Sequence, residues 1–348
     1  MIDRLARALD DARRRWVPDP RLGVFEVSVK VADSADAPPH VLAGCTTSRE
    51  ALTGVRRLAA EAQIAEQVSL LPDSSVGADA AAVVHTAVAP LYEHPGTAHA
   101  SRASEALHGE RLDLLQKDGP WLRVRAADGY HAWTHAGYLA CGTEAWANDW
   151  TARATLWSLG AELKLEDGRL RLPVGARVAA RLRDQLEAAD GRIGMLATGV
   201  IRAATEAGAE ARLVAAPEWA LRWLGGAPYV WGGRTDWGVD CSGLVQTTFA
   251  VRGTSLPRDA DLQFDAGRSV VMAPDGAGYE AGDLLFFAES GRVSHVALWA
   301  GAGRIVHAAL ARGGVATDDL YGTGSRLRLL RDSLVGVRRV SPKGQMSL

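Results

Sequence analysis

The stretch Val239-Asp240-Cys241-Ser242-Gly243-Leu244-Val245 places a cysteine at the first position of a predicted helix over residues 241–252. Asp240 or Ser242 is suited to cap that helix. The exposed N–H groups of the first turn and the positive end of the helix dipole favour a thiolate there. We therefore predict that Cys241 is a nucleophile.

Two histidines downstream are expected to be neighbours on one sheet. Strands are predicted over 283–288, 293–299 and 304–308, with a turn at Gly301-Ala302-Gly303. Residues twelve apart across that hairpin share a face, so His295 and His307 are opposed or diagonal neighbours. This predicts His295 as the general base for Cys241, with His307 bonding its other ring nitrogen and fixing the tautomer.

The bulk composition is that of an ordinary globular chain with several domains. At 348 residues, two to four domains are expected. A net charge of -2 with interspersed signs gives no reason to expect nucleic acid or an anionic membrane as the main partner. No run of about 18 apolar residues suggests a membrane span.

The cysteines and the N-terminus bear on location. Cys45, Cys141 and Cys241 have neither CxxC spacing nor the pattern of a disulfide framework, and we expect the first two to be small buried residues. The charged stretch 1–11 does not resemble a secretory signal peptide. A cytoplasmic location is therefore expected.

Three segments precede the last domain. Residues 1–76 are predicted to form a helical or α/β preface, with a strand over 23–29 and a helix from Arg49 to Leu71, before Pro72. From about residue 80 short alternating runs are separated by turn dipeptides such as Asp118-Gly119 and Asp128-Gly129, which indicates a small β-barrel over 77–145.

A second barrel is predicted over 146–212, because the pattern repeats there. The stretch 172–178 resembles 107–112, and Asp190-Gly191 takes the place of Asp128-Gly129. The Ala-rich stretch 206–216 is expected to be a linker or cap leading into an α+β domain over 213–348, in which helices pack on an antiparallel sheet. The fold class predicted for the chain is thus α+β.

No metal site is expected. His131 and His135 are four residues apart, but their segment alternates like a strand and lacks the HExxH pattern of zinc proteases. The chemistry predicted for Cys241 needs neither a metal nor an organic cofactor.

Several separated motifs resemble the NlpC/P60 cysteine peptidases in order and spacing, over about residues 214–340. They are the stretches 226–233 (GAPYVWGG), 240–245 (DCSGLV), 256–259 (LPRD), 282–287 (GDLLFF) and 294–298 (SHVAL). The resemblance implies a papain-like fold for this domain. Two SH3-like modules upstream are similar to the bacterial SH3b domains of endopeptidases that cut γ-D-glutamyl-L-diamino acid bonds.

The resemblance implies roles for particular residues. Cys241 matches the nucleophile, His295 the general base and His307 the third polar member. Residues expected to line the substrate site are Tyr229, whose hydroxyl is placed near the oxyanion, together with Trp231, Asp240, Ser242, Arg258 and Asp259, and, from the first barrel, Tyr130 and Glu93.

Asp259 matches the carboxylate that meets the free amine of the substrate's L-Ala. Ala260 departs from the serine that similar enzymes often have, which puts one substrate hydrogen bond in doubt. A buried carboxylate left without its ammonium partner is costly, so such a pocket would reject an acylated N-terminus.

The implied reaction is hydrolysis of the bond between γ-D-Glu and the diamino acid in short murein peptides with a free N-terminal L-Ala. With the first barrel as a wall of the cleft, this favours recycling of murein peptides in the cytoplasm. Two alternatives stay open: an exported cell-wall lysin and a non-catalytic peptidoglycan-binding protein. The sequence also leaves open lysine against diaminopimelate, and the oligomeric state.

Overall fold

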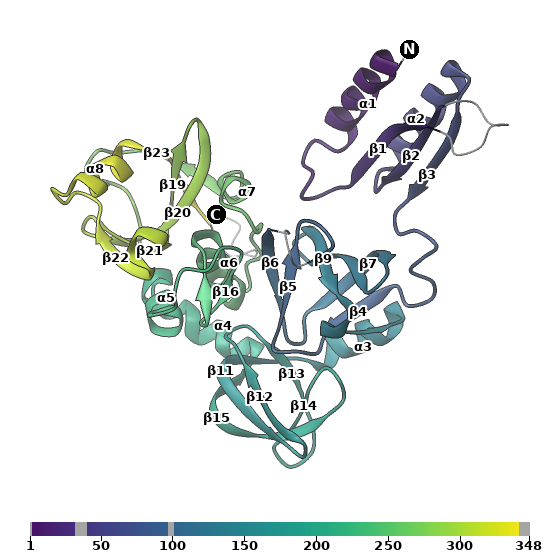
Figure 1. Cartoon of the computed structure of the whole chain (residues 1–348). Coiled ribbons are helices and arrows are strands. Elements are labelled where there is room, and N and C mark those ends of the chain that lie inside the picture. Colours follow the sequence, from purple (N-terminus) through teal and green to yellow (C-terminus); the bar gives the residue numbers. More distant parts are fainter. Residues whose placement is uncertain (1, 32–39, 97–100, 341–348) are drawn as a thin grey trace, which may run out of the picture.

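A computed structural model describes residues 2–31, 40–96 and 101–340 of the chain. Figure 1 shows an N-terminal unit that contains α1 and α2, strand-rich units that follow it along the chain, and a C-terminal part in which helices pack on a sheet. The α+β fold class predicted from the sequence is confirmed. The division of the chain at residues 76, 145 and 212 stays a prediction.

The N-terminal unit is a three-stranded sheet with two helices. Strand β2 lies in the centre, antiparallel to β1 and parallel to β3. Leu42, Leu52 and Val55 are at the centre of its hydrophobic core. The elements are α1 (Ile2–Trp16), β1 (Phe25–Val31), β2 (His40–Thr46), α2 (Arg49–Ala62) and β3 (Ala65–Leu70).

The helix predicted from Arg49 to Leu71 is wrong in its second half. Helix α2 ends at Ala62, where Gln63 adopts a left-handed conformation with φ 55° and its N–H bonds the Ala59 and Ala60 carbonyls. The following residues form β3, which pairs with β2 and buries Val68. Tertiary pairing therefore overrides a pattern that reads locally as helix.

The first strand-rich unit is the expected barrel. Its strands run in the order β10-β4-β7-β8-β9-β5-β6, and side chains such as Leu91, Leu114 and Val124 fill the interior. The elements are β4 (Ala81–Val84), β5 (Val88–Tyr92), β6 (Arg102–Leu107), β7 (Arg111–Asp118), β8 (Trp121–Arg125), β9 (His131–His135), η1 (Ala136–Tyr138) and β10 (Leu139–Gly142).

The second strand-rich unit closes on itself, because β11 pairs with both β13 and β15, the first and last strands of the run β13-β14-β15. Asp190-Gly191 forms the turn between β14 and β15, with Gly191 at φ 83°. The Arg177 N–H donates to the His108 carbonyl at 2.8 Å and links the two barrels. The elements are α3 (Glu144–Arg153), β11 (Leu156–Leu165), β12 (Gly168–Leu172), β13 (Arg177–Ala180), β14 (Gln185–Glu187) and β15 (Ile193–Ala203).

The C-terminal part packs helices on one antiparallel sheet of strand order β18-β23-β19-β20-β21-β22. Leu244 of α6 and Val296 of β20 belong to the core between them. Its elements before the sheet are α4 (Ala204–Arg212), α5 (Ala216–Leu224), β16 (Arg234–Thr235), β17 (Gly238–Val239), α6 (Cys241–Val251) and α7 (Ala260–Phe264). The others are β18 (Arg268–Val270), β19 (Leu284–Glu289), β20 (Arg292–Gly301), β21 (Arg304–Ala309), η2 (Leu310–Arg312), β22 (Gly314–Asp319), α8 (Ser325–Asp332) and β23 (Leu334–Arg339).

Two further features of the C-terminal part and of the chain concern helices. The stretch 206–216 is mostly helical, with α4 and the start of α5, rather than a plain linker. Of the helices in the described ranges, none is both long and apolar enough to cross a membrane.

Candidate active site

Cys241 is the first residue of α6, and Asp240 caps that helix. Asp240 Oδ1 accepts the Gly243 N–H at 2.7 Å, and its Oδ2 accepts the Gly232 N–H at 2.9 Å. The helix start is packed so closely that a Cβ on Gly243 would lie 2.1 Å from the Gly233 carbonyl oxygen. Asp240 therefore acts as the helix cap, the role the sequence suggested for it or Ser242, and fixes the position of the thiol.

The Cys241 thiol is buried, and burial is the largest influence on its pKa. Burial raises the pKa of Cys241 to about 12, and the charge of Asp240 adds to the rise. The Val296 N–H and Arg258 act in the opposite direction, towards the thiolate. The thiolate expected from the helix start is thus outweighed, and the sulfur needs a base to take its proton during attack.

His295 and His307 are diagonal neighbours on β20 and β21, one of the two arrangements predicted. Leu298 pairs with Val306, so His307 lies opposite Ala297, two residues from His295. The His295 Nε2 and His307 Nδ1 atoms are 2.8 Å apart. The two rings therefore share one hydrogen bond.

Asp318 on β22 extends this row. His307 Nε2 lies 3.0 Å from Asp318 Oδ2. Burial alone would raise the pKa of Asp318, but hydrogen bonds from Arg326 and His307 hold it below the usual value. Arg326 Nη2 contacts the same oxygen at 2.8 Å. Asp318 is therefore a carboxylate that can only accept.

The protonation of both rings follows from that acceptor. Burial lowers the pKa of His295 to about 3, with a further contribution from His307, and burial also lowers the pKa of His307. In a neutral His307 that donates from Nε2, Nδ1 must accept, so His295 donates from its Nε2. His295 Nδ1 is then unprotonated and able to accept a proton.

The sequence analysis did not single out Asp318. On β22, His307 pairs with Ala316, and Asp318 lies two residues further along that strand. Asp318 is therefore a diagonal neighbour of His307, as His307 is of His295. No strand was predicted around Asp318, which lies beyond the predicted strand 304–308, and nothing in the local pattern indicated that its segment would pair with β21.

The two aromatic residues predicted at the cleft differ in burial. Tyr229 is half-buried, and burial raises the pKa of its hydroxyl to about 12, with Cys241 and Asp240 adding to the rise. Its hydroxyl is therefore a protonated donor beside the thiol. Trp231 is 65% exposed and offers an open aromatic surface.

Arg258 is buried and ties the site to the first barrel. Its Nη2 meets Asp240 Oδ2 at 2.7 Å, and its Nη1 bonds Ser242 Oγ at 2.8 Å. Its Nε donates to Ser104 Oγ of β6 at 2.9 Å. Arg234 reinforces the same boundary, because its backbone N–H donates to Glu105 Oε2 at 2.9 Å. The first barrel is therefore fixed beside the start of α6, where Cys241 lies.

Asp259 is mostly shielded and faces the first barrel. Burial raises its pKa, while Arg258 and Arg21 oppose the rise. Tyr130 is buried, and Asp259 and Glu93 both add to the effect of burial in raising the pKa of Tyr130. Glu93 itself is exposed, and Ala260 is buried at the start of α7.

The remaining cysteines and histidines lie elsewhere. Cys45 is buried as expected, whereas Cys141 is exposed, contrary to expectation. Within the described ranges no group of three His, Cys, Asp or Glu residues is arranged to hold a metal ion. His131 Nε2 lies 3.1 Å from the Gly23 carbonyl oxygen, and His135 caps the short helix η1.

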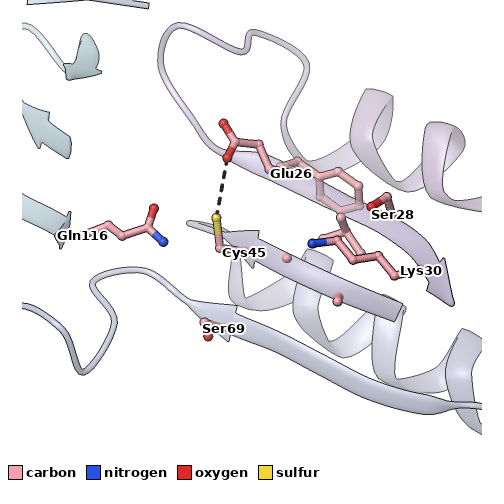
Figure 2. Close-up of a pocket in the computed structure, with 10 residues that line it drawn as sticks. Glu26, Ser28, Lys30, Cys45, Ser69 and Gln116 are labelled. Carbon is pink, nitrogen blue, oxygen red and sulfur yellow. Dashed lines mark hydrogen bonds between the residues drawn. The ribbon is translucent and has the colours of Figure 1, made fainter. Parts of the chain in front are cut away.

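A cavity of about 490 Å³ lies on the sheet of the N-terminal unit (Figure 2). Cys45 Sγ is 3.8 Å from Glu26 Oε2 there, and burial raises the pKa of that thiol. Lys30 and Gln116 also line the cavity. None of the predicted catalytic residues lies in it, so it is separate from the candidate active site.

Comparisons with known sequences agree with this architecture. The NlpC/P60 family profile matches residues 226–333, and the profile of the bacterial dipeptidyl-peptidase SH3 domain matches residues 91–136. The gamma-D-glutamyl-L-lysine dipeptidyl-peptidase of Bacillus subtilis (strain 168) is 44% identical over 85 residues, which is 24% of this chain and 27% of that protein.

A bifunctional muramidase/DL-endopeptidase from the same organism is 42% identical over 84 residues, 23% of this chain and 24% of that protein. The chain thus spans about a quarter of the length of these relatives. The crystal structure of an NlpC/P60 family protein from Bacillus cereus ATCC 10987 matches with a TM-score of 0.59 at 20% identity, covering 74% of this chain and 99% of that one. At that identity the likeness concerns the fold.

Proposed function

We propose that residues 226–333, which match the NlpC/P60 family profile, form a cysteine peptidase domain, and that the chain uses it to hydrolyse short murein peptides with a free N-terminal L-Ala. The bond cut is that between γ-D-Glu and the diamino acid. The observation that supports this proposal is the first barrel, which Arg258 bonds through Ser104 and which brings Tyr130 near enough to Asp259 for that carboxylate to help raise the pKa of Tyr130. A substrate site bounded by the barrel on that side would suit a short peptide end.

The reaction begins with proton transfer from Cys241 to His295 Nδ1. The sulfur attacks the γ-carbonyl carbon of D-Glu, and the Cys241 backbone N–H and the Tyr229 hydroxyl meet the oxyanion. His295 then returns the proton to the departing amine, which leaves a thioester. Water activated by His295 hydrolyses the thioester, restores the thiol and releases the dipeptide.

Specificity for a free amine follows from the charge of Asp259. A substrate ammonium placed against this carboxylate gains a pairing that an uncharged amide cannot supply. Intact wall carries its L-Ala as a lactyl amide and would be refused. Released peptides would be accepted, which fits recycling.

A cytoplasmic location is part of the proposal. All three cysteines are unpaired in the structure, which is compatible with a reducing compartment. Fractionation of cells followed by immunodetection tests it, and recovery of the protein outside the cytoplasm would count against recycling.

A second candidate is an endopeptidase that acts on intact wall. Its support is the 42% identity with a bifunctional muramidase/DL-endopeptidase over 84 residues. That function would require that the site around Asp259 admit a blocked N-terminus.

One assay separates these functions. The protein is incubated with L-Ala-γ-D-Glu-diaminopimelate, its lysine counterpart, the N-acetylated forms of both, and purified sacculi, with Cys241→Ala as control. Release of the diamino acid from the free tripeptides alone supports the proposal, and the faster of the two identifies the preferred residue. Solubilised sacculi would support the wall enzyme, and activity of Cys241→Ala would refute the nucleophile.

A further inference from the structure

Arg21 brings the N-terminal unit into the candidate active site. It lies in the loop between α1 and β1, and its Nη1 donates to Asp259 Oδ2 at 2.9 Å across 238 residues of sequence. The same guanidinium bonds Asp261 at 2.7 and 2.9 Å and Asp19 at 3.0 and 2.7 Å. These five bonds use every N–H that an arginine side chain has.

The first barrel holds the loop in place independently of Arg21's side chain. The His131 N–H donates to the Arg21 carbonyl at 3.0 Å, and His131 Nε2 lies 3.1 Å from the Gly23 carbonyl oxygen. Val24 and Leu115 pack together in a shared buried cluster. In Figure 1 the loop reaches from the N-terminal unit towards the first barrel and α7. The position of Arg21 is therefore built into the fold.

The charges around Arg21 do not cancel. Asp19, Asp259 and Asp261 are three carboxylates sharing one guanidinium, which leaves an excess of two negative charges. Arg258 also faces Asp259, but it is paired with Asp240. Among the described residues, no hydrogen bond reaches Asp259 Oδ1. An ammonium group is the ligand that this arrangement lacks.

We propose that Arg21 is a positioning residue of the amine site: it holds Asp259 by Oδ2 and leaves Oδ1 for the N-terminal ammonium of the substrate. This rests on the function proposed above and adds the N-terminal unit to the specificity of that site. Arg21 does not itself contact the reacting atoms.

The competing interpretation makes Arg21 a plug that occupies the place of the amine. An Arg21 that blocked the amine site would have to lose its hydrogen bond to Asp259 when substrate binds. Its hydrogen bonds to Asp261 would then also have to break or lengthen. The Arg21 guanidinium makes two hydrogen bonds to each of Asp19 and Asp261 but one to Asp259, so the first two carboxylates hold it more firmly. The geometry favours a clamp over a plug.

Removing Arg21 should change how substrate binding depends on pH. The charged and titratable groups around Asp259 are Arg258 and Asp261 on its own segment, Arg21 and Asp19 from the loop, and Tyr130 and Glu93 from the first barrel. Without Arg21, Asp259 and Asp261 face one another unshielded, so protonation of Asp259 sets in at higher pH. Substrate binding would fail earlier on acidification.

The experiment compares Arg21→Gln and Arg21→Lys with Arg57→Gln, an exposed arginine of the same unit paired with Glu61. In Arg21→Gln, KM for the free tripeptide rises about tenfold with a smaller change in kcat, and the acid limb of kcat/KM moves to higher pH. Turnover of the acetylated tripeptide does not change. Arg21→Lys recovers part of the loss, since it keeps the charge without the fork, and Arg57→Gln matches the wild type.

Unchanged KM and an unchanged acid limb in Arg21→Gln overturn the proposal, and a higher kcat/KM identifies a plug instead. If Arg21→Gln does not fold, Arg21→Lys decides on the same two readouts. A wild-type enzyme without preference for the free amine would refute the proposed function itself, which is a different outcome.

Discussion

His307 donates to Asp318 across neighbouring strands, with Nε2 and Oδ2 3.0 Å apart. Because a carboxylate only accepts, this bond determines which nitrogens of His307 and His295 carry protons. It leaves His295 Nδ1 unprotonated, as the role of general base proposed for His295 requires. The protonation of His295 thus depends on a residue two strands away.

We predict that Asp318→Asn lowers kcat by about ten- to a hundredfold while changing KM little, because an amide can present N–H to His307 and reverse the tautomer. Steady-state kinetics on the free tripeptide measures this. Arg312→Gln is the matched control, since its Nε lies 3.6 Å from Asp318 Oδ1 and contributes weakly. Equal kcat in Asp318→Asn and wild type would contradict the tautomer argument.

The histidine pair was predictable and Asp318 was not, for a physical reason. A glycine-rich turn at 301–303 connects one hairpin locally, so spacing predicts that His295 and His307 are opposed or diagonal neighbours, and the observed register shows that they are diagonal. Asp318 reaches His307 through a second connection, residues 310–313, which contains the short helix η2 and gives no such register signal.

Arg258 is predicted to be a main determinant of how the first barrel is held. Replacing it by Met leaves the buried Asp240 carboxylate without its cation and removes the bond to Ser104. We expect a loss of about 3 kcal/mol in the free energy of unfolding. Denaturant unfolding measures it, with Arg57→Met, an exposed arginine, expected to change stability by less than about 0.5 kcal/mol. A loss as small as the control's would refute this role.

The start of α6 is predicted to tolerate no side chain at Gly243. An added Cβ would lie 2.1 Å from the Gly233 carbonyl, which is backbone and cannot move aside cheaply. Gly243→Ala should lower stability by about 2 kcal/mol or more and reduce activity through displacement of Cys241. Gly54 lies in α2, and the nearest atom to an added Cβ there is Trp16 Nε1 of α1 at 4.0 Å, so Gly54→Ala should instead stabilise by up to about 1 kcal/mol. If the thermal unfolding midpoints of Gly243→Ala and Gly54→Ala shifted in the same direction from that of the wild type, this reasoning would be contradicted.

Contacts between the units could not be predicted from the sequence. The strands of the first barrel follow from alternation and turn dipeptides, but Arg21 meets Asp259 across 238 residues, and no local pattern encodes that pairing. The end of α2 was missed because Gln63, rather than glycine, adopts the left-handed cap. In each case the deciding interaction is tertiary.

Acid sensitivity is predicted at the junction of the barrels. His108 is fully buried, its Nε2 accepts the Ala189 N–H at 3.1 Å, and burial lowers its pKa to about 4. Between pH 6.5 and 4 the unfolded chain therefore binds more protons at this residue than the folded chain does, so stability falls as pH falls, by at most about 1.4 kcal/mol per pH unit.

Unfolding at pH 6.5 and 5.5 for wild type and His108→Gln tests this. The variant should lose less stability over that interval, because its amide does not titrate while its oxygen can still accept from Ala189. An equal loss in both proteins would show that His108 is not responsible.

The amine specificity should disappear with the charge of Asp259. Asp259→Asn is expected to lower kcat/KM for the free tripeptide by about a hundredfold and to leave the acetylated tripeptide unaffected, so the preference between them collapses. Since burial raises the pKa of Asp259, wild-type kcat/KM should fall with acidification at a pH above that usual for an aspartate, and this limb should be absent in Asp259→Asn. Asp261→Asn is the matched variant, because Asp261 shares Arg21 but is not placed as the amine ligand. If Asp261→Asn removes the preference and Asp259→Asn does not, the ammonium lies against the other carboxylate, and the pocket must be reassigned to Asp261.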